Sequence, residues 1–302
     1  MSLRRTVLPL AVLLVFTLCA FDCNGNGGDE NGDQEQEEVE SITIAAFNIQ
    51  VFGETKAGKP DVMSTLAQIA QEFDVMVVQE IRNADMVVAD QYLARINQDA
   101  DPDYAMYEGP REGRTSSKEQ YVVYYRTPLV EFMSASVYQE TNDEFEREPL
   151  IVTLKANEFD FTLIICHIKP DSADIELGHM ATVANSVLAA NPDEQDIILL
   201  GDFNADGRYW DEDKTNHPLK AAAYHWVIGN EWDTTVATNT YTYDRIILTP
   251  ATYDYEYIED SAAAFYFDQE YGLTDHDFVE DVSDHYPVFA EFRITGLDDD
   301  GS

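Results

Sequence analysis

This 302-residue chain is poor in basic residues. Only 18 lysines and arginines stand against 58 aspartates and glutamates, so the formal net charge is −40. A body this acidic repels the phosphate backbone of nucleic acid at long range, which excludes general, charge-driven binding of nucleic acid. The surplus of negative charge favours solubility and a salty medium, and it makes screening by salt or divalent cations important.

Cysteine is nearly absent as well. Two of the three cysteines, Cys19 and Cys23, lie near the N-terminus, and Cys166 stands alone inside an apolar run. A disulfide therefore cannot form within the region after residue 40, and we expect Cys166 to be a small buried apolar residue. Because 45% of the residues are hydrophobic and 12% are aromatic, the chain can bury a sizeable core without such a crosslink.

Long apolar runs are missing except at the N-terminus. Two arginines precede an apolar run from about Val7 to Phe21, which is short for a membrane span and typical of an export signal. We expect residues 1–23 to be an export signal, of plain or lipoprotein type, with Cys23 or Cys19 as the lipid-bearing residue in the second case. The protein would then be extracellular, periplasmic or anchored at the cell surface.

The rest of the chain divides by composition. Residues 24–40 are rich in Gly, Asn and Glu, so we expect a disordered acidic tether. No linker or repeat interrupts residues 41–296, which we interpret as one domain, and residues 297–302 form an acidic tail.

One stretch organises the domain. The apolar run 197–200 has the length of a buried strand, and it is followed by Gly201-Asp202-Phe203-Asn204-Ala205-Asp206. If the chain stays extended there, Asp202 and Asn204 leave the same face. A carboxylate and a carboxamide at a strand end suit a hard divalent cation or a phosphate group, and an Asx-rich turn is the ordinary alternative.

Five other segments place polar side chains at the end of an apolar run. Together they supply oxygen ligands, two histidines and several carboxylates, which is the inventory for metal-assisted hydrolysis of a phosphate ester. The segments cover residues 44–50, 75–82, 163–170, 243–248 and 282–288. Around them the sequence predicts helices over 60–73, 84–98 and 175–190, a partly helical stretch over 217–226, and strands over 41–51 (ending at Asn48), 74–79, 121–126, 150–155, 159–167, 240–248 and 285–294.

Taken in this order, the segments resemble the deoxyribonuclease I branch of the endonuclease/exonuclease/phosphatase superfamily. The resemblance runs from about Ser41 to Ile294, and residues 113–121, 146–149 and 226–235 strengthen it. It implies an α/β (α+β) four-layer sandwich, in which two mixed β-sheets are flanked by helices and the site lies at one end. It also implies a monomeric endonuclease that hydrolyses DNA phosphodiester bonds by in-line attack of water, with Mg²⁺ or Mn²⁺ as cofactor.

The resemblance assigns roles to individual residues. Asn48, Glu80 and Asp284 would hold the metal ion, although an asparagine at a strand end is also a common structural cap. His167 and His285 would transfer protons, oriented by Glu119 and Asp244 respectively. One pair would activate the attacking water and the other would protonate the leaving 3′ oxygen, and either assignment is open. Asp202 and Asn204 would complete the cluster by orienting water and phosphate or by binding a second cation.

Arg82 and Arg147 match positions that contact DNA in the family, and Arg114 and Tyr209 are further candidates for contact with the substrate phosphate or with DNA. Many of the scarce basic residues also lie in or beside the motif segments, which predicts a locally positive cleft on a negative body. Ser117 departs from the family pattern, which has an aromatic residue there that packs on a sugar. This departure weakens the expectation of strong duplex binding but not that of hydrolysis.

The resemblance also implies two structural Ca²⁺ sites. Asp233 and Thr235 match one site, and Asp143 and Glu148 match the other, although plain solvated charge is the usual state of acidic loop residues. A disulfide of the secreted animal relatives is missing, because Gly207 and Tyr241 stand at its two positions.

Two other functions remain open at this point. A relative of the same fold and metal could hydrolyse a phospholipid head group or another small phosphate ester. Alternatively, the chain could be a catalytically inactive binding protein at the cell surface, but its intact set of candidate catalytic residues argues against this.

Overall fold

The computed structural model describes residues 40–115 and 118–296. The predicted export signal, tether and acidic tail, with Cys19, Cys23 and Ser117, lie outside these residues, so their interpretation stays a prediction. Within the described ranges, none of the helices is long and apolar enough to cross a membrane.

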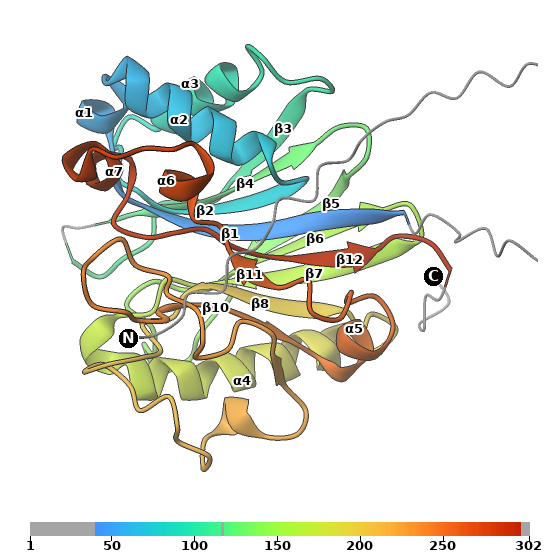
Figure 1. Ribbon diagram of the computed structural model, residues 1–302. Helices are drawn as coiled ribbons and strands as arrows, with labels where there is room; N and C mark the ends of the chain where they lie inside the picture. The colour runs from blue at the N-terminus through green and yellow to red at the C-terminus, as the bar shows by residue number, and fades with distance from the viewer. Residues whose placement is uncertain (1–39, 116–117, 297–302) are drawn as a thin grey trace, which may run out of the picture. The chain divides into compact units, whose positions relative to one another are not determined.

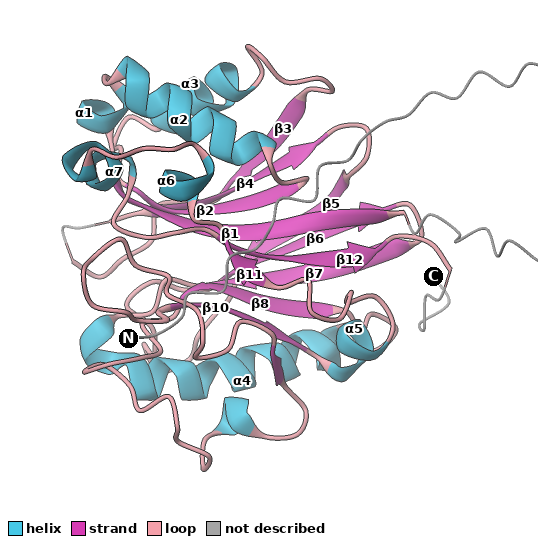
Figure 2. Cartoon of the chain, viewed as in Figure 1, coloured by secondary structure: helices cyan, strands magenta, loops and turns pink. Residues whose placement is uncertain are grey.

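Two six-stranded sheets form the centre of the domain (Figure 2). The first sheet contains β1 (Ser41–Phe52), β2 (Val75–Ile81), β3 (Tyr104–Glu108), β4 (Gln120–Arg126), β11 (Ala263–Ala264) and β12 (Val288–Arg293), in the order β11-β12-β1-β2-β4-β3. The second contains β5 (Glu131–Val137), β6 (Leu150–Ala156), β7 (Phe159–Ile165), β8 (Ile197–Asp202), β9 (His225–Trp226) and β10 (Asp244–Leu248), in the order β5-β6-β7-β8-β10-β9. Both sheets are mixed, because β1 pairs parallel with β2 and β7 pairs parallel with β8, whereas the other neighbours are antiparallel.

Helices cover the outer faces of the two sheets (Figure 1). The first sheet is covered by α1 (Glu54–Ala57), α2 (Pro60–Gln71), α3 (Val88–Ile96), α6 (Phe267–Glu270) and α7 (His276–Val282). The second is covered by α4 (Ala173–Ala190), preceded by the 3₁₀ turn η1 (Pro170–Ser172), with η2 (Pro218–Lys220) beside it. The short α5 (Pro250–Asp254) follows β10. The four-layer sandwich predicted from the sequence is thereby confirmed.

Three layers of apolar side chains hold these four layers together. Val77, Phe161 and Phe292 belong to the cluster between the two sheets. A second cluster lies between the first sheet and its helices, and a third lies between the second sheet and α4. The strand β8 contributes to the central and α4-facing clusters, since Ile198 and Leu200 point to one face and Ile197 and Leu199 to the other. This explains why β8 reads as a continuous apolar run.

The structure corrects several predicted element boundaries. The strand expected to end at Asn48 continues to Phe52, with a register shift against β2 after Asn48 and positive φ at Gln50 and Val51. The helix expected from residue 84 begins only at Val88, because the Asn83 carboxamide accepts hydrogen bonds from the two backbone amides before and at that point. Strands β3, β5, β9 and β11 and helices α1, α5, α6 and α7 were not predicted.

Candidate active site

The Asp202 carboxylate lies at the centre of a polar cluster at the ends of the strands. Its Oδ2 atom accepts a hydrogen bond from Asn48 Nδ2 at 3.0 Å. The same oxygen lies 3.4 Å from His167 Nε2 and 3.7 Å from His285 Nε2. Asp202 ends β8, Asn48 lies in β1, and the two histidines follow β7 and precede β12. Three other segments that are far apart in sequence therefore converge on the Asp202 carboxylate.

The loop after β8 turns sharply instead of staying extended. Asn204 has a φ of +47°, and its backbone N–H donates to Asp202 Oδ1 at 3.0 Å. Its side-chain Nδ2 donates to the Ile168 carbonyl at 2.9 Å. The expectation that Asp202 and Asn204 leave the same face of an extended chain is therefore wrong, because an Asx turn brings them together. The turn fixes the Asp202 carboxylate in place. The Asx turn, which was the alternative interpretation of this motif, is therefore itself part of the site.

His285 and Asp244 form a buried pair on one side of Asp202. His285 Nδ1 lies 2.7 Å from Asp244 Oδ2. Asp244 begins β10 directly opposite Asp202 in β8, so the antiparallel register sets two carboxylates side by side. Burial opposes the charged ring, but the carboxylates of Asp244 and Asp202 outweigh it and raise the pKa of His285 well above its ordinary value. Since Nδ1 contacts Asp244, Nε2 is left to exchange a proton within the cluster.

His167 and Glu119 form the corresponding pair on the other side. His167 Nδ1 lies 3.2 Å from Glu119 Oε2, and both side chains are buried. Burial would raise the pKa of Glu119, but His167 and the nearby arginines together hold it below its usual value. The pKa of His167 is raised, because Glu119 outweighs the effect of burial. Both pairings expected from the sequence are present, and their roles in proton transfer stay predictions.

The candidate metal residues come from the first sheet and the loop before β12. Glu80 Oε2 accepts a hydrogen bond from Val51 N at 2.8 Å, and its Oε1 has only a long contact of 3.4 Å with Asn48 Nδ2. Asp284 Oδ2 accepts from Gln50 Nε2 at 2.8 Å, while its buried Oδ1 has no hydrogen-bond partner among the described residues. These carboxylate oxygens fit the hard-oxygen preference of Mg²⁺ or Mn²⁺. Asn48, by contrast, directs its Nδ2 at the cluster, while its Oδ1 accepts a hydrogen bond from Gln50 N at 2.9 Å.

Two groups of three side chains also have ligand atoms within 4.8 Å of one another, namely Glu80–Glu119–His167 and Asp202–Asp244–His285. The first group joins the predicted metal ligand Glu80 to one histidine pair. The second consists of the other pair and the central carboxylate. Asp284 belongs to neither group, and its Oδ1 lies 3.9 Å from His285 Nε2.

Carboxylates hold the predicted DNA-contacting arginines. Arg82 Nη2 lies 3.0 Å from Glu80, and Arg114 makes ion pairs with Glu140 and Asp143 at 3.0 and 2.7 Å. Lys169 and Arg126 also pair with acidic side chains. The ion pairs of Arg82, Arg114, Arg126 and Lys169 with carboxylates weaken the locally positive cleft that the sequence predicted.

Arg147 is buried rather than presented to solvent. Its Nε donates to the His167 carbonyl at 3.0 Å and lies 2.7 Å from Glu119 Oε1. This side chain therefore supports the Glu119–His167 pair from behind, a position that the expected DNA-backbone contact did not suggest.

Tyr209, by contrast, is half-buried, with the exposed Arg208 guanidinium stacked over its ring and Tyr243 as an aromatic neighbour. Tyr209 therefore keeps a partly accessible ring, and its neighbour Tyr243 in turn lies beside the ring of His285.

The four predicted calcium residues have partners within the protein. Asp233 Oδ1 accepts hydrogen bonds from the backbone N and the Oγ1 of Thr235 at 3.2 and 3.1 Å. Asp143 pairs with Arg114, and Glu148 lies against Glu112, whose pKa is raised by burial and by this second carboxylate. The structure thus brings Asp233 to Thr235 as expected, but it places the other two residues beside partners that were not expected. Calcium binding at both places stays a prediction.

An aromatic contact occupies the place of the missing disulfide. Gly207 has a φ of +63°, and a Cβ there would meet the Tyr241 ring at 2.7 Å. Tyr241 in turn stacks on Tyr243, with ring centroids 5.1 Å apart. The ring of Tyr241 therefore packs on the Gly207 backbone, where a side chain would not fit. Cys166 is a free, buried thiol, as expected.

Lys56 is a buried residue that sequence patterns did not single out. Its ammonium donates to the carbonyls of Ile49 and Val282, both at 3.0 Å. Burial lowers the pKa of Lys56 to about 8, although Asp284 and Glu80 act in the opposite direction. It therefore ties β1, which carries Asn48, to the end of α7, two residues before Asp284. A lone lysine in a short helix gives no sequence signal of this burial.

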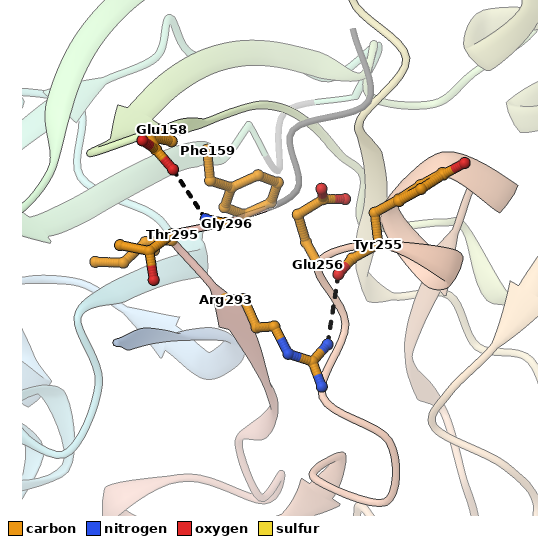
Figure 3. A pocket seen from close by; sticks show the side chains of 8 residues that line it. Glu158, Phe159, Tyr255, Glu256, Arg293, Thr295 and Gly296 are labelled. Atoms are coloured by element: carbon orange, nitrogen blue, oxygen red, sulfur yellow. Dashed lines mark hydrogen bonds between the residues drawn. The ribbon is translucent and has the colours of Figure 1, made fainter. Parts of the chain in front are cut away.

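A small cavity lies away from this cluster (Figure 3). It has a volume of about 10 Å³, and Glu158, Phe159, Tyr255 and Arg293 are among the residues that line it. Phe159 begins β7, whereas the polar cluster lies beyond the other end of that strand. The cavity is too small for a substrate, and none of the residues that line it belongs to the polar cluster.

Comparison with known proteins agrees with this geometry. The Endonuclease/Exonuclease/phosphatase family model matches residues 45–285. Deoxyribonuclease-1 of Equus caballus and of Homo sapiens are each 33% identical over 261 residues, covering 82% of this chain and 91% of the relative. Deoxyribonuclease-1-like 2 of Mus musculus is 32% identical over 259 residues, covering 84% and 92%.

Solved structures share the fold at low sequence identity. A truncated Caenorhabditis elegans TDP2 superposes with a TM-score of 0.60 at 14% identity, covering 84% of this chain and 97% of its own. A D. rerio TDP2 complexed with single strand DNA product gives 0.60 at 17% identity, covering 84% and 99%. With the two histidine–carboxylate pairs in place, the chain belongs to the endonuclease/exonuclease/phosphatase family, as a deoxyribonuclease I-like member.

Proposed function

We propose that this protein is an exported, Mg²⁺- or Mn²⁺-dependent endonuclease that hydrolyses DNA phosphodiester bonds. Phosphodiester hydrolysis follows from the family and from the deoxyribonucleases to which the chain is similar. The observation that carries the proposal is the convergence of His167 Nε2 and His285 Nε2 on Asp202, each ring backed by its own carboxylate. Export, attachment to the cell surface through a lipidated N-terminal cysteine and dependence on a divalent metal ion all belong to this proposal.

Two proton-transfer groups facing one point are what an in-line displacement requires. Water attacks phosphorus from one side while the 3′ oxygen leaves from the other, so one group must accept a proton and the other must donate one. The Nε2 atoms of His167 and His285 can serve these two ends, because each Nδ1 contacts Glu119 or Asp244. One histidine takes the proton of the attacking water, and the other gives its proton to the leaving oxygen. After each turnover, the first histidine must release its extra proton to solvent, and the second must take one up.

Glu80 and Asn48 would hold the metal ion, with Asp284 close by. When bound, such an ion neutralises charge on the phosphate and polarises the phosphorus–oxygen bond. Glu80 is held for this purpose by Val51 N and Arg82, which fix its Oε2 and leave Oε1 less engaged. The Asn48 Nδ2 and the Asn204 backbone N–H, which both donate to Asp202, can orient the phosphate oxygens around that carboxylate.

Hydrolysis of a phospholipid head group or a small phosphate ester is the second candidate. It is favoured by the pairing of Arg114 with Glu140 and Asp143 and by the burial of Arg147, which leave fewer free cations for a DNA backbone. The Gly113–Tyr121 and Glu146–Pro149 segments of the deoxyribonuclease branch favour DNA.

The test is a comparison of substrates with the purified protein. Supercoiled plasmid, sphingomyelin vesicles and bis(p-nitrophenyl) phosphate are each incubated with Mg²⁺ and with a chelator. Nicking of plasmid that requires Mg²⁺, at a rate above that on the other substrates, is the expected result. Preferential cleavage of sphingomyelin would select the second candidate, and no turnover of any substrate would favour the inactive binding protein.

A further inference from the structure

Gln79 is a buried amide that joins the two sheets at the candidate active site. It lies in β2, directly before Glu80, and its side chain is fully buried. Its Nε2 donates to the Cys166 carbonyl at 2.7 Å, and its Oε1 accepts from Asp202 N at 2.8 Å. One side chain of the first sheet therefore bonds to the ends of β7 and β8 in the second. The sequence motifs did not single it out.

Gly201 has the conformation that this contact needs. Its φ is +138°, and a Cβ at this position would overlap with Gln79 Nε2 and with the Cys166 carbonyl oxygen. A larger residue would therefore push the amide out of place, besides being strained at that φ. The glycine of the Gly201-Asp202 motif thus makes room for a side chain that comes from the other sheet.

Gln79 and the two backbone groups that it contacts are each part of, or adjacent in sequence to, a candidate catalytic or metal-binding residue. Glu80 follows Gln79, His167 follows Cys166, and Asp202 itself supplies the N–H. The candidate metal residues Asn48 and Glu80 belong to the first sheet, whereas His167 and Asp202 extend from the second. The relative position of these two sets depends on how the sheets are joined at this end. The Asn48–Asp202 hydrogen bond is a direct contact between them, and it is made by the reacting groups themselves.

We propose that Gln79 is a positioning residue for phosphodiester hydrolysis, which sets the metal residues of the first sheet against His167 and Asp202 of the second. This inference deepens the proposed function and depends on it for its kinetic readout. A carboxamide suits the position because it donates and accepts at once. A glutamate of the same size lacks the donor when ionised, and a methionine lacks both groups and leaves two buried backbone groups without partners.

The experiment compares Gln79→Met with Gln71→Met. Gln71 also donates to a backbone carbonyl, that of Ile96 at 2.8 Å, but it lies at the end of α2, outside the site. For each protein we would measure kcat on bis(p-nitrophenyl) phosphate, the half-saturating Mg²⁺ concentration, the melting temperature, and hydrogen exchange of the Asp202 amide. All kinetic values are taken below the melting transition and expressed per folded molecule.

Gln79→Met is expected to lower kcat by about tenfold to a hundredfold, because sub-ångström misplacement of reacting groups is costly. The half-saturating Mg²⁺ concentration should change by less than about threefold, since Asn48 and Glu80 both lie in the first sheet and keep their positions relative to each other. Exchange of the Asp202 amide should be accelerated, and Gln71→Met should show none of these changes. If Gln79→Met does not fold, Gln79→Asn, which keeps both groups on a shorter arm, should show the same pattern more weakly.

An unchanged kcat per folded molecule would overturn the proposal, because Gln79 would then only stabilise the fold. A rise in the half-saturating Mg²⁺ concentration that accounts for the whole loss of rate would overturn it as well. Wild-type protein without any turnover would contradict the proposed function instead. The Asp202 exchange rate would still test the link between the sheets, and unaltered exchange in Gln79→Met would refute it.

Discussion

The Arg147 guanidinium lies 2.7 Å from the Glu119 carboxylate, and both side chains are buried. Arg147 also donates to the carbonyl of His167 at 3.0 Å, so one side chain contacts both members of the pair. A buried carboxylate left without its cation costs several kcal/mol or gains a proton, and Glu119 would then orient His167 poorly. Support of the Glu119–His167 pair and contact with the DNA backbone are two different roles for Arg147, and they predict different effects of its removal.

Arg147→Met is expected to lower the rate on bis(p-nitrophenyl) phosphate and on plasmid by similar factors, of about a hundredfold or more. A small diester has no extended backbone, so a pure DNA contact would leave its hydrolysis unchanged. Arg95→Met is the control, because Arg95 makes an exposed ion pair with Asp99 on α3. Loss of plasmid cleavage alone would show that Arg147 acts on DNA and not through Glu119.

His285 and Asp244 should behave as one unit. His285→Ala is expected to lower the turnover by about two or more orders of magnitude, as removal of a positioned acid or base does. Asp244→Ala should reproduce much of that loss, because the ring then lacks the 2.7 Å contact that orients it. Adding His167→Ala to His285→Ala should cost less than the product of the two single effects.

The measurement is kcat of the single and double variants on plasmid, with His276→Ala on the exposed part of α7 as control. DNA binding in Ca²⁺ without turnover should change little. An Asp244→Ala enzyme with normal turnover beside an inactive His285→Ala enzyme would show that the two are not a functional pair.

The raised pKa of His285 also predicts how the stability of the metal-free protein depends on pH. A histidine whose pKa is higher in the folded state than its ordinary 6.5 binds its proton more tightly when folded. Its contribution to stability is complete below about pH 6.5 and is lost as the pH rises through the folded-state value. The free energy of unfolding in chelator should therefore fall on the alkaline side.

Chemical denaturation at a series of pH values, with and without His285→Gln, measures this contribution. The variant should show a smaller alkaline loss than the wild type, whereas His276→Gln should retain the wild-type slope. Equal slopes in wild type and His285→Gln would mean that the carboxylates around the ring do not hold its proton.

The charge of the chain predicts an unusual response to salt. With a net charge of −40, the body repels DNA at long range, and its arginines near the site are paired with carboxylates. Added monovalent salt should first help DNA to approach and then weaken the local contacts. The rate of plasmid nicking should therefore peak at moderate or high salt. A steady fall from low salt, as a basic nuclease shows, would contradict this expectation.

The sequence predicted the parts of the site that stand at strand ends. Glu80, His167, Asp202 and His285 each lie at or next to the end of a strand, so their convergence follows from the sheet order once the sandwich is assumed. The pairing of Asp244 with His285 was expected from the resemblance and is present at 2.7 Å.

Other features could not be predicted because they depend on contacts between distant segments. Arg114 meets Asp143 through a loop that has no periodic pattern, so a separate role was predicted for each of the two residues. Lys56 is buried by carbonyls from residues 49 and 282, which no local pattern can reveal. The conformation of Asn204, with its φ of +47°, overrides the extended geometry that a spacing of two residues suggests.

The most direct test of the central claim is plasmid nicking by wild type and Glu80→Gln across a range of Mg²⁺ concentrations. The substitution keeps the shape of the side chain but removes one negative charge from the proposed metal site. Circular dichroism and the melting temperature control for folding. Wild type should nick plasmid only with Mg²⁺, and folded Glu80→Gln should lose nearly all activity at low Mg²⁺. Near wild-type turnover by Glu80→Gln at low Mg²⁺, or nicking by wild type in chelator, would contradict the account.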